Sequence, residues 1–307
     1  MAYLVRRVLQ TVIVVFGVSV FAFGLMFLTG DPAEVRLGAG ADLMTADEIQ
    51  EYREKMGYDR PWYVQYLDFL GGAVQGDFGD SIRYHEPAFE VVRRRFPATA
   101  QLAVVSLLIS VALGVPIGVI SATHPNTWLD YLTTFIALVG QSVPSFWLGI
   151  MLMLIFGVWL RWLPISGRGG WQNLLMPSFT LAAFSLARNM RLTRSSLLEV
   201  IQQDYVRTAR AKGLSEYRVL FGHALRNAML PIVTMIGLQL GFLMAGSVIT
   251  ESIFAWPGVG RLIIEAIYNK DFPLIQAGVT MLAIAFTMVN LIVDLLYAYI
   301  DPRVRYD

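Results

Sequence analysis

The chain has 307 residues, of which 56% are hydrophobic and only 15% are charged. Average soluble domains contain roughly 45–50% apolar and 25% charged residues. Together with a net charge of +1 and a mean hydropathy of +0.55, this composition excludes a disordered chain, a nucleic-acid-binding protein held by bulk charge and most soluble enzymes. The chain has no cysteine, which excludes disulfides, thiolate zinc sites and cysteine nucleophiles. The composition therefore indicates a membrane protein.

Six stretches are apolar enough, or nearly so, to cross a membrane as helices, for which about 20 apolar residues are needed. In chain order they are Val8–Gly30, Phe96–Leu129, Tyr131–Leu160, Gly169–Ala187, Asn227–Thr250 and Ala277–Ile300. The helix of the second stretch is expected to end near Ser121, and that of the fourth to begin near Pro177. The first stretch follows Arg6 and Arg7 as a signal peptide would. It is too long for a typical signal core and lacks a small-x-small cleavage site, so we interpret it as a retained anchor.

The segment between the first two spans is expected to fold outside the cytoplasm. This amino-terminal segment, residues 31–95, holds 13 carboxylates and eight basic residues. Thr45 and Glu48 have the spacing of a capping box, so a helix is predicted to run to about Met56 and to end at Gly57. A second aromatic, apolar stretch and a helix leading into the second span follow, at Tyr63–Leu70 and Pro87–Arg95.

The placement of lysine and arginine predicts the orientation in the membrane. With six spans, the two ends of the chain and the loop from Arg188 to Arg226 share one side and hold 12 of the 24 basic residues, whereas the two short loops on the other side hold four. Because basic residues in short loops remain in the cytoplasm, both termini are predicted to be cytoplasmic. No internal repeat is visible. We expect one membrane protein made of residues 1–95, the anchor helix with the amino-terminal segment, and residues 96–307, the transmembrane core.

Signatures of catalysis are missing from the sequence. It has no Gly-x4-Gly-Lys-Ser/Thr phosphate loop, no His-Glu-x-x-His and no Gly-x-Ser-x-Gly, and the three histidines lie far apart. The glycine pair Gly258–Gly260 is better explained as a turn than as a nucleotide site. We therefore expect no catalytic residue, metal or cofactor on this chain. If ATP drives transport, ATP and Mg²⁺ must bind to partner subunits.

The most informative segment is the basic stretch between the fourth and fifth spans. Helical structure is predicted over about 202–217, interrupted where Gly213 takes the left-handed conformation that ends a helix. Tyr205, Ala209 and Gly213 follow at i, i+4 and i+8 and therefore lie on one face of the helix. The side chains on this face become small toward its end, so that another protein can approach it closely. Three basic residues border this face: Arg207, Arg210 and Lys212. A basic helix lying on anionic lipid explains the same spacing, so both interpretations stay open.

Here the sequence resembles a known family. Tyr205–Gly213 (Tyr-Val-Arg-Thr-Ala-Arg-Ala-Lys-Gly) and His223–Ala228 (His-Ala-Leu-Arg-Asn-Ala) are similar to the cytoplasmic loop of ABC importer permeases of the dipeptide, oligopeptide, nickel and glutathione group. Ala209 and Gly213 match the general Glu-Ala-Ala-x3-Gly motif of such permeases, whereas its glutamate and first alanine are replaced. Three further segments are similar to the same group: Val74–Ser81, Glu251–Arg261 and Asp301–Arg305.

This resemblance runs the whole length of the chain and implies both a fold and partners. The expected fold is that of a type I ABC importer permease, all-α with six transmembrane helices and an extracytoplasmic N-terminal elaboration. The expected partners in a bacterial inner membrane are a second permease, two ATP-binding subunits and an extracytoplasmic substrate-binding protein, with no nucleic acid. The resemblance implies that the ATP-binding subunits contact the 202–217 helix and that the substrate is a short peptide or a related compound.

Two sets of polar or aromatic residues in and near the spans are candidates for the transport route. Four uncharged polar residues lie within the spans and either line a translocation path or bond one helix to another: Gln141, Ser142, Ser145 and Gln239. The second set forms either an outer gate or an aromatic anchor at the membrane interface: Glu251, Trp256, Pro257 and Gly258. Asp294 in the last span has two interpretations: it takes part in a proton relay, or it makes a structural bond to a neighbouring helix. The rival functions are an ion-coupled secondary transporter using Asp294 and Glu251, and a membrane scaffold without a transport path.

Overall fold

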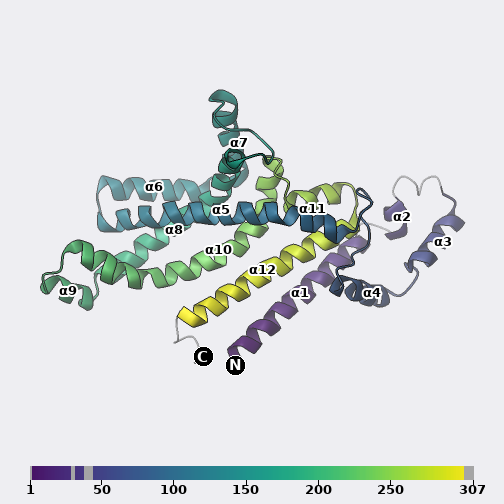
Figure 1. The fold of residues 1–307 in the computed structure, drawn as a ribbon, viewed down its shortest axis with the longest axis horizontal. Helices are drawn as coiled ribbons and strands as arrows, with labels where there is room; N and C mark the ends of the chain where they lie inside the picture. Colours follow the sequence, from purple (N-terminus) through teal and green to yellow (C-terminus); the bar gives the residue numbers. More distant parts are fainter. Residues whose placement is uncertain (1, 29–31, 38–43, 301–307) are drawn as a thin grey trace. The chain divides into compact units, whose positions relative to one another are not determined.

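The computed structural model describes residues 2–28, 32–37 and 44–300, and these residues form helices joined by short loops, without a β-strand (Figure 1). They belong to two compact units, which we describe separately. Of the described residues, the first unit contains those up to 99 and 257–295, and the second contains 100–256 and 296–300. The first unit is thus built from the two ends of the chain.

The first unit contains two long apolar helices, the start of a third and four shorter ones. They are α1 (Ala2–Leu28), α2 (Pro32–Leu37), α3 (Ala46–Met56), α4 (Trp62–Val74), the beginning of α5 (Ala88–Thr123), α11 (Val259–Tyr268) and α12 (Phe272–Ile300). A buried core joins Phe23 of α1, Val92 of α5 and Leu262 of α11. Arg7 Nη1 of α1 lies 3.2 Å from Asp294 Oδ2 of α12, so an ion pair also joins the two long helices.

Aromatic contacts hold α4 against α1. The Tyr66 ring packs edge-on against Phe23 with centroids 5.4 Å apart, and its hydroxyl lies 2.8 Å from Ser19 Oγ. Phe69 continues the row to Phe78 with centroids 6.0 Å apart. The aromatic, apolar stretch expected at 63–70 is therefore a helix whose rings are bound to the first span.

A hydrogen-bonded carboxylate anchors the loop after α4 to the start of α12. Asp271 is fully buried and accepts hydrogen bonds from Ser81 Oγ and from the Arg83 backbone N–H at 3.1 Å. Its other oxygen accepts from the Leu274 N–H at 3.3 Å, which satisfies an otherwise unpaired donor in the first turn of α12. The Val74–Ser81 segment of the sequence resemblance thus ends in a structural anchor.

The local predictions for the amino-terminal segment are confirmed. Thr45 caps α3 with a complete capping box to Glu48, and Gly57 ends the helix with a left-handed φ of 72°. The Thr45 hydrogen bonds hold the pKa of Glu48 below its ordinary value. The helix predicted at 87–95 leads into the second span without a break, because α5 runs from Ala88 to Thr123.

The second unit packs its helices around α8. It contains the rest of α5, α6 (Trp128–Ser142), α7 (Ser145–Leu152), a π-helical segment (Met153–Trp159), α8 (Trp171–Ile201), α9 (Asp204–Ala211), a second π-helical segment (Arg218–Ala224) and α10 (Leu225–Ile253). Helix α8 contacts α6, α7 and α10. It also approaches α5 so closely that a Cβ on Gly114 or Gly118 would lie within 3 Å of its atoms. This small-xxx-small pair therefore makes room for α8.

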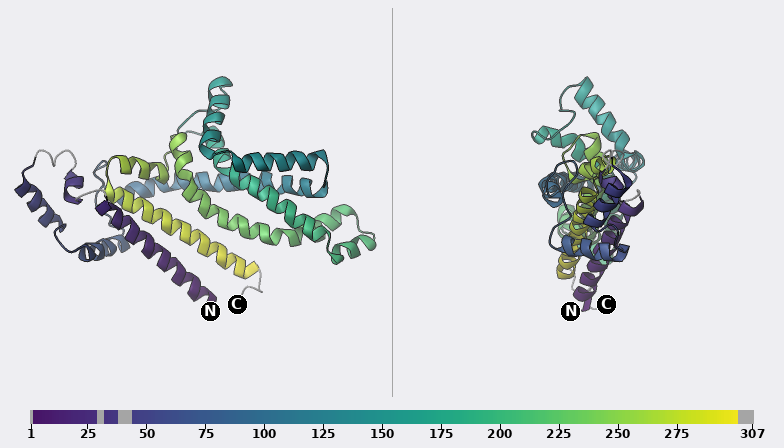
Figure 2. Two further views of the ribbon diagram at one scale, coloured as in Figure 1. Left: turned by 180° about the vertical axis from the view of Figure 1, so that it is seen from behind. Right: turned by 90° about the vertical axis from the view of Figure 1, so that its right-hand side faces the viewer.

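Two predicted spans have different bounds in the structure. The stretch 131–160 was expected to form one span, and in the structure it is broken between α6 and α7, which meet at an angle of 105° (Figure 2). Pro144 disfavours helical geometry at the preceding residue, and Val143 is extended with ψ 123°. Helix α8 begins at Trp171 rather than near Pro177, which lies inside it. It then continues through the arginines that were expected to form a loop, because arginine is a good helix former.

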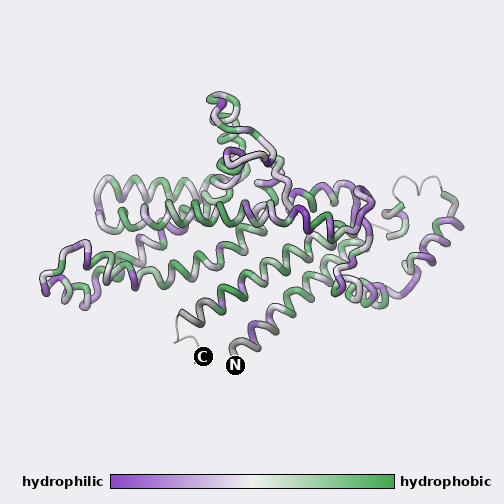
Figure 3. Tube along the Cα trace, viewed as in Figure 1, coloured by the Kyte–Doolittle hydropathy of each residue, from purple (hydrophilic) through white to green (hydrophobic). Residues whose placement is uncertain are grey.

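The number of spans differs from six when counted by length and hydropathy. Among the described residues, four helices are long and apolar enough to cross a membrane, and a fifth is added if the bent α6–α7 pair is one span. Figure 3 shows the hydrophobic colours along α10 and α12 and the hydrophilic colours over α3. Helix α8 is the remaining long helix and does not belong to that group; its second half carries four charged residues, Arg188, Arg191, Arg194 and Glu199.

Candidate functional site

The four residues predicted for a translocation path line one hollow in the second unit. This hollow has a volume of about 480 Å³ and is bounded by α6, α7, α8 and α10. Gln141 and Ser142 end α6, and Ser145 begins α7, so all three surround the break at Pro144. Gln239 enters from α10. The break turns polar side chains toward the space that a continuous helix would have closed.

Gln239 also bonds one helix to another. Its Nε2 donates to Asn189 Oδ1 of α8 at 2.7 Å, and Asn189 Nδ2 donates back to Gln239 Oε1 at 3.2 Å. Asn189 Nδ2 is also 3.4 Å from the carbonyl of Ser110 on α5. All three residues are buried. The packing explanation that the sequence left open therefore applies to Gln239, which also lines the hollow.

A second hollow, of about 630 Å³, adjoins the first and shares Gln141, Phe184 and Arg188 with it. Three arginines of α8 line it: Arg188, Arg191 and Arg194. Arg191 Nη1 donates to Gln141 Oε1, and Arg188 Nη2 lies 4.0 Å from Met235 Sδ. Positive side chains thus border one end of the polar hollow.

The third of these arginines is neutralised by a buried aspartate. Arg194 Nε and Nη2 donate to the two carboxylate oxygens of Asp130 at 2.7 and 2.9 Å. Ser121 Oγ donates to the same carboxylate at 2.6 Å, and the Asn126 backbone N–H donates at 3.1 Å. This cluster connects the end of α5, the following turn, α6 and α8.

The residues predicted for an outer gate belong to both compact units. Glu251 is fully buried in α10, where it accepts from Ser247 Oγ at 2.9 Å, and its carbonyl accepts from the Trp256 N–H at 2.8 Å. Trp256 is buried with the Arg168 guanidinium 5.7 Å from its ring centroid. In the first unit, Pro257 leads into Gly258, the N-cap of α11. Glu251 and Trp256 thus form a packed helix end in the second unit.

The predicted coupling segment consists of a short helix and a turn. Helix α9 covers Asp204–Ala211, within the predicted range of 202–217, and Gly213 has the predicted left-handed φ of 76°. The next helix begins at Glu216 and includes the π-helical segment 218–224. Arg210 Nη2 donates to Glu216 Oε1 at 2.5 Å, and this bond holds the pKa of Glu216 below its ordinary value. The pair closes the turn between the two helices.

The face of α9 with small residues is only partly exposed. Ala209 is buried with Val206 in a core that also contains Leu197 of α8 and Val219. The expectation that Ala209 presents a small surface to another protein is therefore wrong for this chain, because its own core covers that residue. Four of the other predicted coupling residues are exposed: Arg207, Arg210, Lys212 and Gly213. Tyr205 is 42% exposed, and its hydroxyl accepts from Asn227 Nδ2 at 2.8 Å.

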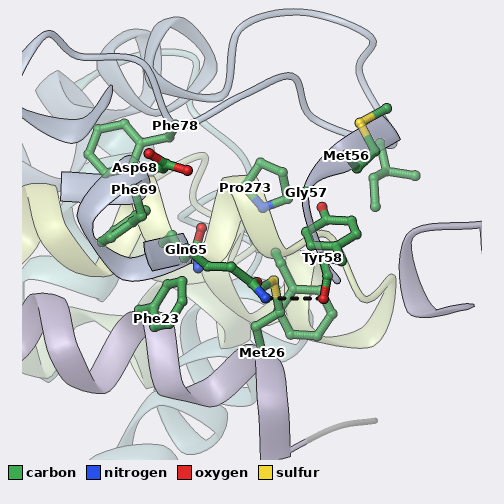
Figure 4. Close-up of a pocket in the computed structure, with 13 residues that line it drawn as sticks. Phe23, Met26, Met56, Gly57, Tyr58, Gln65, Asp68, Phe69, Phe78 and Pro273 are labelled. Carbon is green, nitrogen blue, oxygen red and sulfur yellow. Dashed lines mark hydrogen bonds between the residues drawn. The ribbon is translucent and has the colours of Figure 1, made fainter. Parts of the chain in front are cut away.

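A smaller hollow lies in the first unit between α1, α4 and the start of α12. Its volume is about 160 Å³, and Phe23, Met26 and Phe69 supply much of its apolar lining (Figure 4). Gln65 spans it and donates from Nε2 to the Tyr58 carbonyl at 3.1 Å and the Arg60 carbonyl at 2.8 Å. These bonds fix the turn between α3 and α4.

Sequence reasoning missed three features of the second unit. Gly114 and Gly118 were visible as a Gly-x-x-x-Gly pair. Asn189 offered no signal as the partner of Gln239. Arg188 and Arg191 were assigned to a cytoplasmic loop, although their spacing from Phe184 is helical.

Comparisons with known proteins cover the whole chain. Residues 114–306 match the family described as binding-protein-dependent transport system inner membrane component, and residues 1–103 match its N-terminal counterpart. The glutathione transport system permease protein GsiC of Escherichia coli strain K12 is 43% identical over 305 residues, which is 99% of each chain. GsiC of Shigella flexneri serotype 5b is equally similar.

Solved structures support the fold. An inward-facing crystal form of the MetNI methionine ABC transporter, soaked with selenomethionine, has a chain that aligns with a TM-score of 0.59 at 18% identity. The native crystal form of the same transporter aligns with a TM-score of 0.57. Both alignments cover 69% of this chain and 96% of the other.

Proposed function

Because the chain belongs to the binding-protein-dependent transport system inner membrane components and is an ABC importer permease, we propose that it forms, together with a second permease, a translocation path for short peptides. Glutathione, the substrate named for the GsiC relatives, is a tripeptide and belongs to this class. The observation that carries the proposal is the hollow of about 480 Å³, which all four predicted path residues line within a chain that matches GsiC over 99% of its length.

The partners follow from the family and from what the chain contains. Its described residues include no group of three metal-ligating side chains, and its sequence has no phosphate loop. We infer from the family that ATP and Mg²⁺ bind to two ATP-binding subunits and that an extracytoplasmic binding protein delivers the substrate. The distribution of basic residues supports a cytoplasmic position for both termini in a bacterial cell. Residues 1–95 then carry the outer elaboration, and residues 96–307 carry the core.

We assign energy coupling to α9 and the turn that follows it. Ala209 and Val206 hold the helix on the chain's own core, while Arg207, Lys212 and Gly213 are exposed around its end. A Cβ placed on Gly213 meets no atom within 4 Å, so the space outside this turn is open to a partner. This arrangement suits a helix that docks in a groove of an ATP-binding subunit. Anionic lipid is the competing contact for the same charges.

We assign the docking of the binding protein to the amino-terminal segment. Helix α3 has no buried residue, and its charged side chains include Asp47, Glu51 and Glu54. Such a surface is suited to electrostatic steering of a soluble partner. A cap that packs only on the permease itself is the alternative, and the absence of any buried residue in α3 favours docking.

The rival of an ion-coupled transporter has no support in the family assignment or in the two carboxylates on which it depended. Asp294 is paired with Arg7, and Glu251 accepts a hydrogen bond from Ser247. Both arrangements fit structural roles. For Asp294 this is the bond between helices that the sequence left open.

The test is uptake by the complete complex in proteoliposomes. We expect uptake of glutathione or of a short peptide only with ATP inside the vesicle at the ATP-binding face and loaded binding protein at the other face. A complex without this chain is the negative control. Uptake driven by an ion gradient without ATP, or no uptake of any peptide bound by the binding protein, would contradict the proposal.

A further inference from the structure

We propose that Arg188 and Arg191 of α8 form a carboxylate-binding site on the translocation path, so that this permease favours substrates with a free carboxylate. The inference rests on the proposed function, because it takes the hollow of the second unit as the path. It goes further by naming the chemical group that the path recognises and the two side chains that recognise it.

The two arginines lie on one exposed stripe of α8. Phe184, Arg188, Arg191 and Ser195 follow one another at helical spacing, and all four are exposed. The two arginines line the hollow of about 630 Å³, and Arg188 also lines the adjoining polar hollow. Both side chains are therefore directed at the same open space, beside the polar residues proposed for the path.

Among the described residues, neither arginine is paired with a carboxylate. Over residues 44–300, the described part that contains the second unit, the ion pairs join Arg194 to Asp130 but join no carboxylate to Arg188 or Arg191. The only hydrogen bond shown for Arg191 goes to Gln141 Oε1, which is neutral, and Arg188 contacts the weak acceptor Met235 Sδ. Two like charges three residues apart on one helix also repel each other. An incoming anion would pair with the two arginines and would reduce the repulsion between them.

The lining of the hollow favours the binding of an anion beside the two arginines. Phe184, Leu192 and Met235 supply the apolar part of the lining beside the arginines, and a charged group next to apolar surface requires a counter-charge or water. A guanidinium presents a planar fork of donors that matches a carboxylate in a bidentate geometry. Gln141 fixes one donor of Arg191 and leaves its other N–H groups for a ligand. The site is therefore shaped for the carboxylate of a peptide.

An anionic lipid headgroup has similar chemistry, so the source of the anion must be tested. We favour the substrate because Gln141 and Arg188 belong to both hollows, which places the positive charges on the route of the transported molecule rather than on a separate surface. Arg194 shows the contrast: one helical turn away, the same residue type is already paired with Asp130.

The experiment compares matched substrates in the complete complex. Glutathione is compared with its diethyl ester, in which neither carboxylate is free, and trialanine with its C-terminal amide, each at a concentration that saturates the binding protein. For the parent complex we expect the free acids to enter about tenfold faster than the ester or amide, as one hydrogen-bonded ion pair would give. The double variant R188Q/R191Q should lose this preference by slowing the free acids only. R188K/R191K should retain only part of it, because the charges remain but the planar fork of donors is lost.

Controls separate the possible failures. Arg226→Gln removes an exposed arginine of α10 that lines neither hollow and should preserve the preference. If R188Q/R191Q slows acid and amide equally, or dissociates the complex, the arginines act in folding or assembly and the inference is wrong. It is also wrong if the preference of the parent appears only in vesicles with phosphatidylglycerol and not in phosphatidylcholine alone. If the parent transports no peptide with ATP and binding protein, the proposed function fails as well.

Discussion

Asp130 joins three segments of the second unit through one buried carboxylate. Its side chain is only 4% exposed and takes two hydrogen bonds from Arg194, with further donors from Ser121 and Asn126. A carboxylate removed from water in this way requires all of its partners, because the loss of either charge leaves the other poorly solvated. The arrangement fixes the end of α5 against α6 and α8.

Replacing Asp130 by alanine should destabilise the second unit by about 2 kcal/mol, since Arg194 keeps partial access to solvent. Thermal unfolding of the detergent-solubilised complex would measure the change. Asp204→Asn is the matched control, because Asp204 is almost fully exposed, pairs with Arg207 at 3.6 Å and should contribute less than about 0.5 kcal/mol. Equal unfolding temperatures for Asp130→Ala and the parent would show that this cluster does not stabilise the fold.

At the scale of elements, α9 and α3 differ in how the chain holds them. Helix α9 is fixed by a buried face that contains Val206 and Ala209, and only its outer side is available to a partner. Helix α3 has no buried residue and is defined by its own capping box and its glycine end. A variant that tests α9 must therefore change its exposed end, whereas one that tests α3 must change its exposed charges.

Gly213→Trp should abolish the stimulation of ATP hydrolysis by loaded binding protein while the chain still inserts and assembles. The left-handed φ of 76° costs a non-glycine residue about 1 kcal/mol, and the added ring points into open space where we place the ATP-binding subunit. Gly213→Asn is the control, because asparagine tolerates this conformation and adds little bulk. Full stimulation in the tryptophan variant would exclude this turn as the coupling contact.

Neutralising three carboxylates of α3 should slow association of the binding protein and flatten its salt dependence. The variant combines Asp47→Asn, Glu51→Gln and Glu54→Gln and leaves Glu48, which the capping box needs. Exposed charges act mainly on association rates, so folding should be unchanged. Arg53→Gln with Lys55→Gln removes positive charge from the same helix and should not slow docking. If the rates of the three-carboxylate variant and the parent coincide across a salt series, α3 has no part in docking.

At the scale of the whole molecule, the orientation depends on whether α8 crosses the membrane. Four helices and the bent α6–α7 pair have the length and hydropathy of spans. With α8 as the sixth, both ends of the chain lie on the side that carries Arg188–Arg226, where basic residues are most frequent. Without α8, the two ends would lie on opposite sides.

A reporter fused after Asp307 should therefore be active in the cytoplasm, and one inserted near Leu43 should be active outside it. Both insertion points lie outside the described residues. Alkaline phosphatase and green fluorescent protein fusions in matched pairs would report the two compartments, and a fusion at Arg6 would serve as a cytoplasmic reference. A cytoplasmic signal near Leu43 or an external one after Asp307 would exclude the six-span arrangement.

The sequence determined what depends on local chemistry and on composition. Charge-free apolar runs located the long helices, and Thr45, Glu48 and Gly57 set the ends of α3 because caps act within a few residues. Gly213 was identified as a left-handed turn for the same reason. The family was also readable, because its motifs are continuous in the chain. Sequence reasoning also grouped the four path residues, although it could not choose between lining and packing.

Tertiary structure decided what depends on residues distant in the chain. Only packing showed that Ala209 faces inward, that Gln239 is paired with Asn189 and that Asp130 neutralises Arg194. It also decided that α8 continues past Arg188, which placed two arginines beside the polar hollow instead of in a loop. The physical reason is that a helical propensity or a charge is local, whereas burial and pairing are set by the helices that pack on either side.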